Sequence, residues 1–165
     1  MPKENTKIVN PLMKKFSETL AAIESLEKKV NKSYQKMVRS SHTPELSKCL
    51  SPESTDSEKH MQRLRLIQAS LGSKPSPSRK NDLIPVPKFK KASAQQDLDI
   101  ISHALNLQNQ KLAHYELLHP VAHAMGLETE SELIEQTITD NRNTNTWLRQ
   151  IIQNIIGPSL QQTES

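Results

Sequence analysis

The sequence predicts an all-α protein that folds as an antiparallel four-helix bundle. Apolar residues recur at alternating steps of three and four along most of the chain, as they do on one face of a helix. Aromatic residues make up 3% of the chain and there are 3 glycines, which argues against a β-sandwich or barrel. The hydrophobic fraction is only 34%, which favours amphipathic helices with a narrow apolar stripe.

The first predicted helix begins at Asn10-Pro11 and runs to about residue 40. Asn10 can cap this helix, and proline is favoured at the first helical position. The apolar face consists of Met13, Phe16, Leu20, Ile23, Val30, Tyr34 and Met37. The polar residues 1–9 are expected to form a flexible N-terminus.

The second predicted helix starts at Thr43-Pro44 and is interrupted by Pro52. Proline inside a helix removes a hydrogen bond and clashes with the preceding turn, so we expect a break at Ser51, which can cap the restarted helix. The apolar stripe then continues to Gly72, which is expected to end the helix.

Residues 73–93 form a linker rich in proline and lysine, and we expect them to be extended. The basic side chains of the linker are Lys74, Arg79, Lys80, Lys88, Lys90 and Lys91. The simplest interpretation is a solvated linker. The alternative is a basic docking segment, residues 74–91, for an acidic protein or nucleic acid. Phe89 is its only aromatic residue, so the signal for nucleic acid is weak.

The third predicted helix is capped by Ser93 and closed by Gly126, and Pro120 should kink it without ending it because the apolar pattern resumes afterwards. The fourth helix is expected to open with a capping box at Thr129-Glu130-Ser131-Glu132 and to stop at Gly157-Pro158. Residues 10–157 then form a single domain, and residues 158–165 a flexible C-terminus.

Polar residues interrupt the apolar stripe near the middle of each predicted helix. All four interruptions should meet in one layer of an antiparallel bundle. We predict that this polar core layer contains Glu27, Asp56, His60, Gln108, Lys111, Asp140 and Asn141. Burying unpaired charge is costly, so these groups must be paired, metal-bound or hydrated.

Four segments resemble the YciE/YciF-type stress proteins of the ferritin-like superfamily. They are Leu26-Glu27-Lys28-Lys29-Val30, the run from Asp56 to Leu64, the run from Leu112 to Gly126, and Leu133-Ile134-Glu135-Gln136-Thr137. The resemblance covers about residues 11–71 and 96–152. It implies a ferritin-like bundle and a role in bacterial stress physiology.

The resemblance also implies acidic residues at Glu27, Thr55, Gln108, Lys111 and the Asp140-Asn141 region, and departures at these positions indicate a degenerate metal site. A di-iron or di-manganese centre needs several carboxylates, and few remain. We hypothesise that Lys111 replaces the cation and pairs with Glu27, Asp56 and Asp140. In the alternative, Lys111 extends to solvent.

Two weaker metal sites for iron, manganese or zinc remain possible interpretations. Glu27, Asp56, His60 and Asp140 could hold one ion in a reduced site, with oxidase-like or iron-storage activity. Glu116 and His119 share one helix face at Glu-x-x-His spacing, and His123 lies one turn further on. No partner carboxylate on another helix is evident for this second set.

Taken together, the residues favour a non-catalytic bundle that acts by binding an unidentified protein partner or by self-association, as a homodimer. The single cysteine, Cys49, allows no intrachain disulfide, and there is no apolar N-terminal run, so the cytoplasm is the simplest location and no membrane contact is expected. Trp147 is expected to lie either in the core or at a dimer contact.

Overall fold

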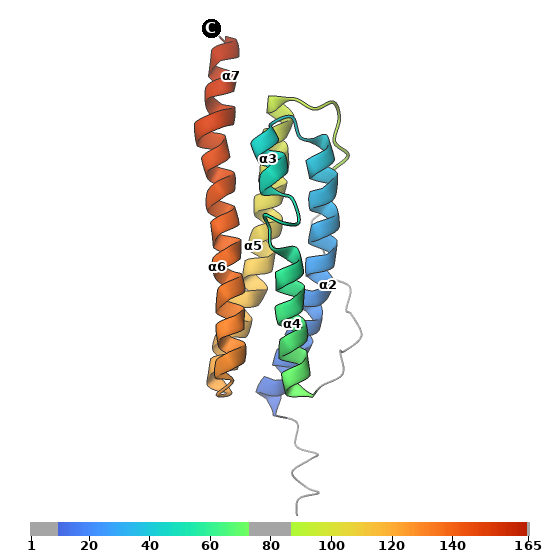
Figure 1. The fold of residues 1–165 in the computed structure, drawn as a ribbon, viewed down its shortest axis with the longest axis vertical. Helices are drawn as coiled ribbons and strands as arrows, with labels where there is room; N and C mark the ends of the chain where they lie inside the picture. The colour runs from blue at the N-terminus through green and yellow to red at the C-terminus, as the bar shows by residue number, and fades with distance from the viewer. Residues whose placement is uncertain (1–9, 73–86, 165) are drawn as a thin grey trace, which may run out of the picture.

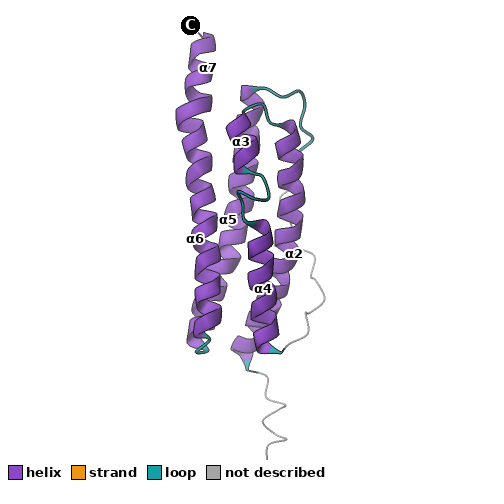
Figure 2. Cartoon of the chain, in the orientation of Figure 1, coloured by secondary structure: helices purple, strands orange, loops and turns teal. Residues whose placement is uncertain are grey.

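A computed structural model describes residues 10–72 and 87–164, and every regular element within these ranges is helical. The elements are α2 (Pro11–Ser40), α3 (Pro44–Cys49), α4 (Ser57–Leu71), α5 (Ala94–Ala124), α6 (Glu128–Ile151), the π-helical turn η1 (Ile152–Ile156) and α7 (Gly157–Glu164). Figure 2 shows these helices packed side by side in a bundle. The predicted all-α bundle is confirmed.

The bundle has four corners, and the short α3 and the longer α4 share one of them (Figure 1). Helix α2 contacts α4 and α5, and α6 contacts the same two helices, so α2 and α6 occupy opposite corners. Neighbouring helices run antiparallel, whereas α4 and α5 run in the same direction. The end of α4 and the start of α5 therefore lie at opposite ends of the bundle, as they do on either side of the single long crossover in ferritin-like folds. Residues 73–86 of the predicted linker lie outside the described ranges.

Several predicted helix ends are confirmed by their capping contacts. The side chain of Asn10 accepts a hydrogen bond of 2.9 Å from the backbone N–H of Leu12. The hydroxyl of Ser93 accepts one of 3.1 Å from the N–H of Gln96 at the start of α5. Gly72 ends α4 with a φ of 63°, in the left-handed region that glycine adopts without steric cost. Helix α5 continues through Pro120 to Ala124, as predicted.

Two predicted helix starts are wrong. The hydroxyl of Ser51 accepts from the N–H of Ser54 and so caps a turn, and α4 begins only at Ser57 after Asp56, whose φ is 55°. Helix α6 begins at Glu128, before the predicted capping box, and no side chain caps it. In both places the chain uses a turn conformation that side-chain patterns signal poorly.

The predicted stop at Gly157-Pro158 is also wrong, because the chain stays helical to Glu164. The N–H of Gly157 bonds to the carbonyl of Ile152, five residues earlier, which makes a π-type turn. Pro158 follows this turn, at the second residue of α7. The expected flexible C-terminus is thus replaced by α7, whose Leu160 packs against the core.

The core consists of two apolar clusters with polar residues between them. One cluster includes Tyr34, Met37 and Leu148, and the other includes Phe16 and Tyr115. Trp147 is partly buried and packs against the first cluster. The polar residues between the clusters come from α2, α4, α5 and α6, which is where the predicted layer falls.

Candidate functional site

Glu27 lies at the centre of the polar layer, on the buried face of α2, with 3% of its surface exposed. Its Oε2 atom is 3.1 Å from Nζ of Lys111. Its Oε1 atom accepts a hydrogen bond of 2.7 Å from the hydroxyl of Tyr115 and lies 3.5 Å from Nδ1 of His60. Three side chains from two other helices therefore surround one buried carboxylate.

These neighbours keep Glu27 ionised. Burial alone would raise the pKa of Glu27, because it disfavours the charged form. The charge of Lys111, the contact with His60 and the hydrogen bond from Tyr115 outweigh burial and lower the pKa from 4.5 to about 2. Burial, and after it the Glu27 carboxylate, raises the pKa of Tyr115, so Tyr115 stays a hydrogen-bond donor.

Lys111 is fully enclosed on α5, with a side chain that is 2% exposed. The alternative in which this side chain extends to solvent is therefore wrong. Its carboxylate partner among the described residues is Glu27, and neither Asp56 nor Asp140 pairs with it. The hypothesis of a buried ion pair holds for one of the three predicted acids.

His60 bridges two carboxylates on different helices. Its Nε2 atom lies 3.3 Å from Oδ2 of Asp140 on α6, and its Nδ1 atom faces Glu27 without forming a hydrogen bond. A neutral imidazole carries one N–H, so it donates to only one of the two acids. The guanidinium of Arg63 supplies a second partner to Asp140, at 2.7 Å, and also donates to Thr137.

Arg63 is a member of the layer that sequence reasoning missed. It lies three residues after His60, and residues at this spacing share one face of a helix. That spacing was the signal available in the sequence. It was easily missed, because Arg63 lies at the edge of the apolar stripe, where surface arginines are common, and its side chain is 18% exposed.

The remaining part of the layer is an uncharged network around Gln108. Its amide nitrogen donates to the side-chain oxygen of Asn141 at 3.1 Å and to the backbone carbonyl of the same residue at 3.2 Å. Its amide oxygen accepts from the hydroxyl of Tyr34 at 2.5 Å. Asn141 in turn donates to the carbonyl of Thr137. Both amide side chains are thus satisfied without a ligand.

The placement of Asp56 in the layer is wrong. Asp56 precedes the first turn of α4, its side chain is 29% exposed, and it pairs with Lys59 at 3.6 Å. Thr55, beside it, is buried and donates to the carbonyl of Ser51. Helix α4 begins five residues later than a helix capped by Ser51 would, so Asp56 lies in the turn before α4 and not on its inward-facing side.

The family model described as "Domain of unknown function (DUF892)" matches residues 12–161. The chain belongs to the DUF892 family. No curated protein matches the sequence.

Two solved structures show the same fold as this DUF892 chain. The stress protein YciF of E. coli matches with a TM-score of 0.69 and 16% identity, over 88% of this chain and 97% of YciF. YcfI of Rhodopseudomonas palustris matches with a TM-score of 0.67 and 17% identity, over 87% of this chain and 96% of YcfI. At these identities the likeness establishes the ferritin-like fold, as the resemblance predicted.

A ferritin-like fold raises the question of a di-metal centre, and the donors of this DUF892 chain do not fit one. Within residues 10–72 and 87–164, no group of three or more His, Cys, Asp or Glu side chains is placed to hold a metal ion. Glu27 and Asp140 each already have a cationic partner, Lys111 and Arg63. Two divalent ions need several bridging carboxylates, and two cations would repel these ammonium and guanidinium groups.

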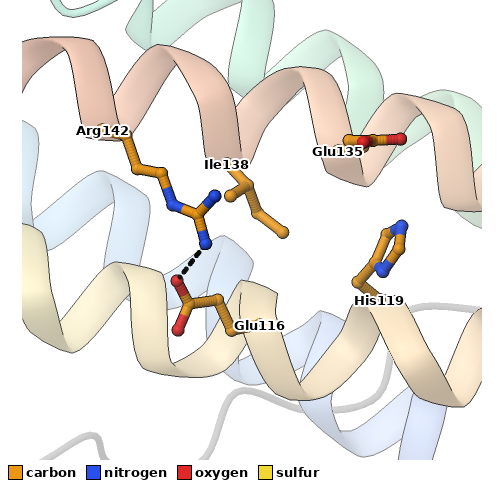
Figure 3. Close-up of a pocket in the computed structure, with 5 residues that line it drawn as sticks. All are labelled: Glu116, His119, Glu135, Ile138 and Arg142. Carbon is orange, nitrogen blue, oxygen red and sulfur yellow. Dashed lines mark hydrogen bonds and ion pairs between the residues drawn. The ribbon is translucent and has the colours of Figure 1, made fainter.

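The second candidate metal set lies on the surface of the DUF892 bundle. Glu116 and His119 of α5 line a cavity of about 410 Å³ together with Glu135, Ile138 and Arg142 of α6 (Figure 3). Glu116 is 48% exposed and pairs with Arg142 at 3.0 Å, while His123 is exposed. The sequence did not reveal a carboxylate on another helix near Glu116 and His119, and Glu135 of α6 is such a carboxylate. The described residues nevertheless form no preassembled metal site here.

Asp97 is a buried carboxylate that sequence reasoning overlooked. It is 0% exposed and accepts hydrogen bonds of 2.8 Å from the backbone N–H groups of His42 and Thr43, as well as one of 2.5 Å from the Thr43 hydroxyl. These donors belong to the connection between α2 and α3, so an acid on α5 fixes the backbone immediately before α3 begins.

No helix among the described residues is long and apolar enough to cross a membrane.

Proposed function

We propose that this DUF892 protein is a non-catalytic ferritin-like bundle, in which side-chain cations take the place of a metal centre. The observation that carries the proposal is the ion pair between Lys111 and Glu27, 3.1 Å long and buried on both sides. A carboxylate that a fixed ammonium already neutralises has little affinity left for a divalent ion.

Charge balance across the layer supports the same proposal. Lys111 offsets Glu27, and Arg63 offsets Asp140, while Gln108 and Asn141 satisfy each other. These two cations balance the two carboxylates, so no net negative charge remains in the layer to attract a metal. The chain would then act by binding a partner or by self-association as a homodimer in the cytoplasm. A role in stress physiology, which the name of E. coli YciF states for that protein, extends the proposal.

Elemental analysis of protein purified without chelators tests the proposal. Cells are grown with added iron, manganese and zinc, and the metal content of the wild type is compared with that of Glu27→Gln. We expect both proteins to contain far less than one ion per chain. The competing function is a metalloprotein with a reduced site at Glu27, His60 and Asp140. One ion per wild-type chain that is lost in Glu27→Gln would establish that function and reject ours.

Sedimentation equilibrium tests self-association directly. We expect a dimer whose mass does not change when iron, manganese or zinc is added, because the layer is closed within each chain. A monomer at every concentration would reject the homodimer and leave binding to a different protein as the route of action.

A further inference from the structure

The exposed face of α2 carries a continuous row of basic side chains. Lys28, Lys32, Lys36 and Arg39 follow at steps of four, four and three, so they lie along one side of the helix, and all four are exposed. The buried residues of α2 lie on the opposite side. At 1.5 Å per residue, this row is roughly 16 Å long.

Almost no negative charge opposes this row. From Ser25 to Ser40 the sequence holds one acidic residue, Glu27, and it is buried in the polar layer. Lys28 pairs with Glu24 at 3.6 Å, but no carboxylate among the described residues pairs with Lys32, Lys36 or Arg39. A charged row left unpaired over several turns attracts anions by its summed field.

A basic loop extends the row at its C-terminal end. Residues 87–93 lie beside the end of α2 (Figure 1), and Lys88, Lys90 and Lys91 of this loop are exposed. Gln96 holds the loop there: it exchanges hydrogen bonds with the backbone of Lys90 and donates to the carbonyl of Ser40 at 3.0 Å. Lys90 therefore lies close to the C-terminal end of α2, which carries Arg39.

The one aromatic residue of this loop is turned inward. Phe89 is partly buried, packs against the apolar core and meets the ring of His103 edge-on, with ring centroids 6.5 Å apart. Single-stranded nucleic acids are usually bound by exposed aromatic rings on which bases stack, and this surface offers none. A straight row of lysine and arginine suits the regularly spaced phosphates of a duplex instead.

We propose that Lys32, Lys36 and Arg39 of α2, with Lys88, Lys90 and Lys91 of the adjoining loop, bind the phosphate backbone of duplex nucleic acid without sequence preference. We call these six residues the α2 basic surface. It shares no residue with the polar layer, so this inference and the proposed function can fail independently.

Fluorescence anisotropy with a labelled mixed-sequence duplex of about 24 base pairs tests the inference. The surface variant is Lys32→Gln/Lys36→Gln/Arg39→Gln. The control Lys59→Gln/Arg65→Gln/Arg149→Gln removes the same charge from exposed positions elsewhere. At about 50 mM salt we expect the surface variant to lose about 30-fold or more in affinity, the control to lose less than about 3-fold, and the wild-type salt slope to fall by about 3 in the surface variant. Circular dichroism verifies that both variants fold.

Five results would overturn the inference. Equal losses in both variants would mean that only net charge matters. Failure of the wild type to bind the duplex at low salt would show that duplex nucleic acid is not the ligand. Tighter binding to a single strand of the same sequence would show the same. Binding to vesicles of anionic phospholipid but not to the duplex would assign the surface to membranes. Dissociation of a wild-type dimer by the surface substitutions, without nucleic acid, would make it a contact between two copies.

Discussion

Lys111 and Glu27 form an ion pair 3.1 Å long, although each side chain is only 2% exposed. Two helices that are neighbours in the bundle, α5 and α2, each contribute one charge to the same buried spot. Such a pair costs desolvation energy and regains it only with good geometry and further hydrogen bonds, which Tyr115 provides here. Removing one partner should therefore be far more harmful than removing both.

Lys111→Met should destabilise the fold by about 3 kcal/mol, because it leaves Glu27 charged, buried and without its cation. Urea unfolding followed by circular dichroism measures this loss. The double variant Lys111→Met/Glu27→Leu should recover most of the stability, since two apolar side chains can fill the same space. A midpoint for Lys111→Met equal to that of the wild type would contradict the importance of the pair.

The stabilising effect of Glu27 should disappear in acid. Its pKa is lowered from 4.5 to about 2 in the folded protein, so its contribution is complete above pH 4.5 and is lost as pH falls towards 2. Unfolding midpoints measured between pH 6 and 2 should therefore fall more steeply for the wild type than for Glu27→Gln. Parallel curves for the two proteins would show that Glu27 titrates normally in the fold.

Asp97→Asn should cost about 2 kcal/mol of stability. Both carboxylate oxygens of Asp97 accept hydrogen bonds, three in all, whereas the amide of asparagine has only one oxygen that can accept. Asp99→Asn, at an exposed position on the same helix, is the matched control and should change stability little. Hydrogen exchange at the N–H groups of His42 and Thr43 should speed up only in the first variant. Equal stabilities of the two variants would rule out a stabilising role for these hydrogen bonds.

Cys49 should resist thiol reagents in the native protein. It is a free, buried cysteine, and burial raises its pKa to about 12, so little reactive thiolate exists at pH 8. Reaction with a chromogenic disulfide should be very slow without denaturant and complete within minutes in urea. Fast labelling of the native protein would indicate that α3 opens readily.

The fold could be predicted from the sequence because the apolar period and the caps at Asn10, Ser93 and Gly72 act locally. The membership of the polar layer was predicted where a polar residue interrupts a long stripe, as Glu27 and Lys111 do. The prediction was wrong for Asp56, because its orientation depends on an irregular turn after Pro52. It missed Asp97, because its partners belong to the connection between α2 and α3 and no spacing within one helix reveals them. It missed Arg63, because its three-residue spacing from His60 is also that of an ordinary surface arginine.

The polar layer separates the two apolar clusters, and this separation affects how the core tolerates substitutions. Residues such as Met37 and Phe16 belong to different clusters and share no neighbours across the layer. Mutational effects at sites without common partners generally add, so each half of the interior can vary in volume without forcing compensation in the other. We therefore expect the two apolar clusters to accept substitutions largely independently of each other.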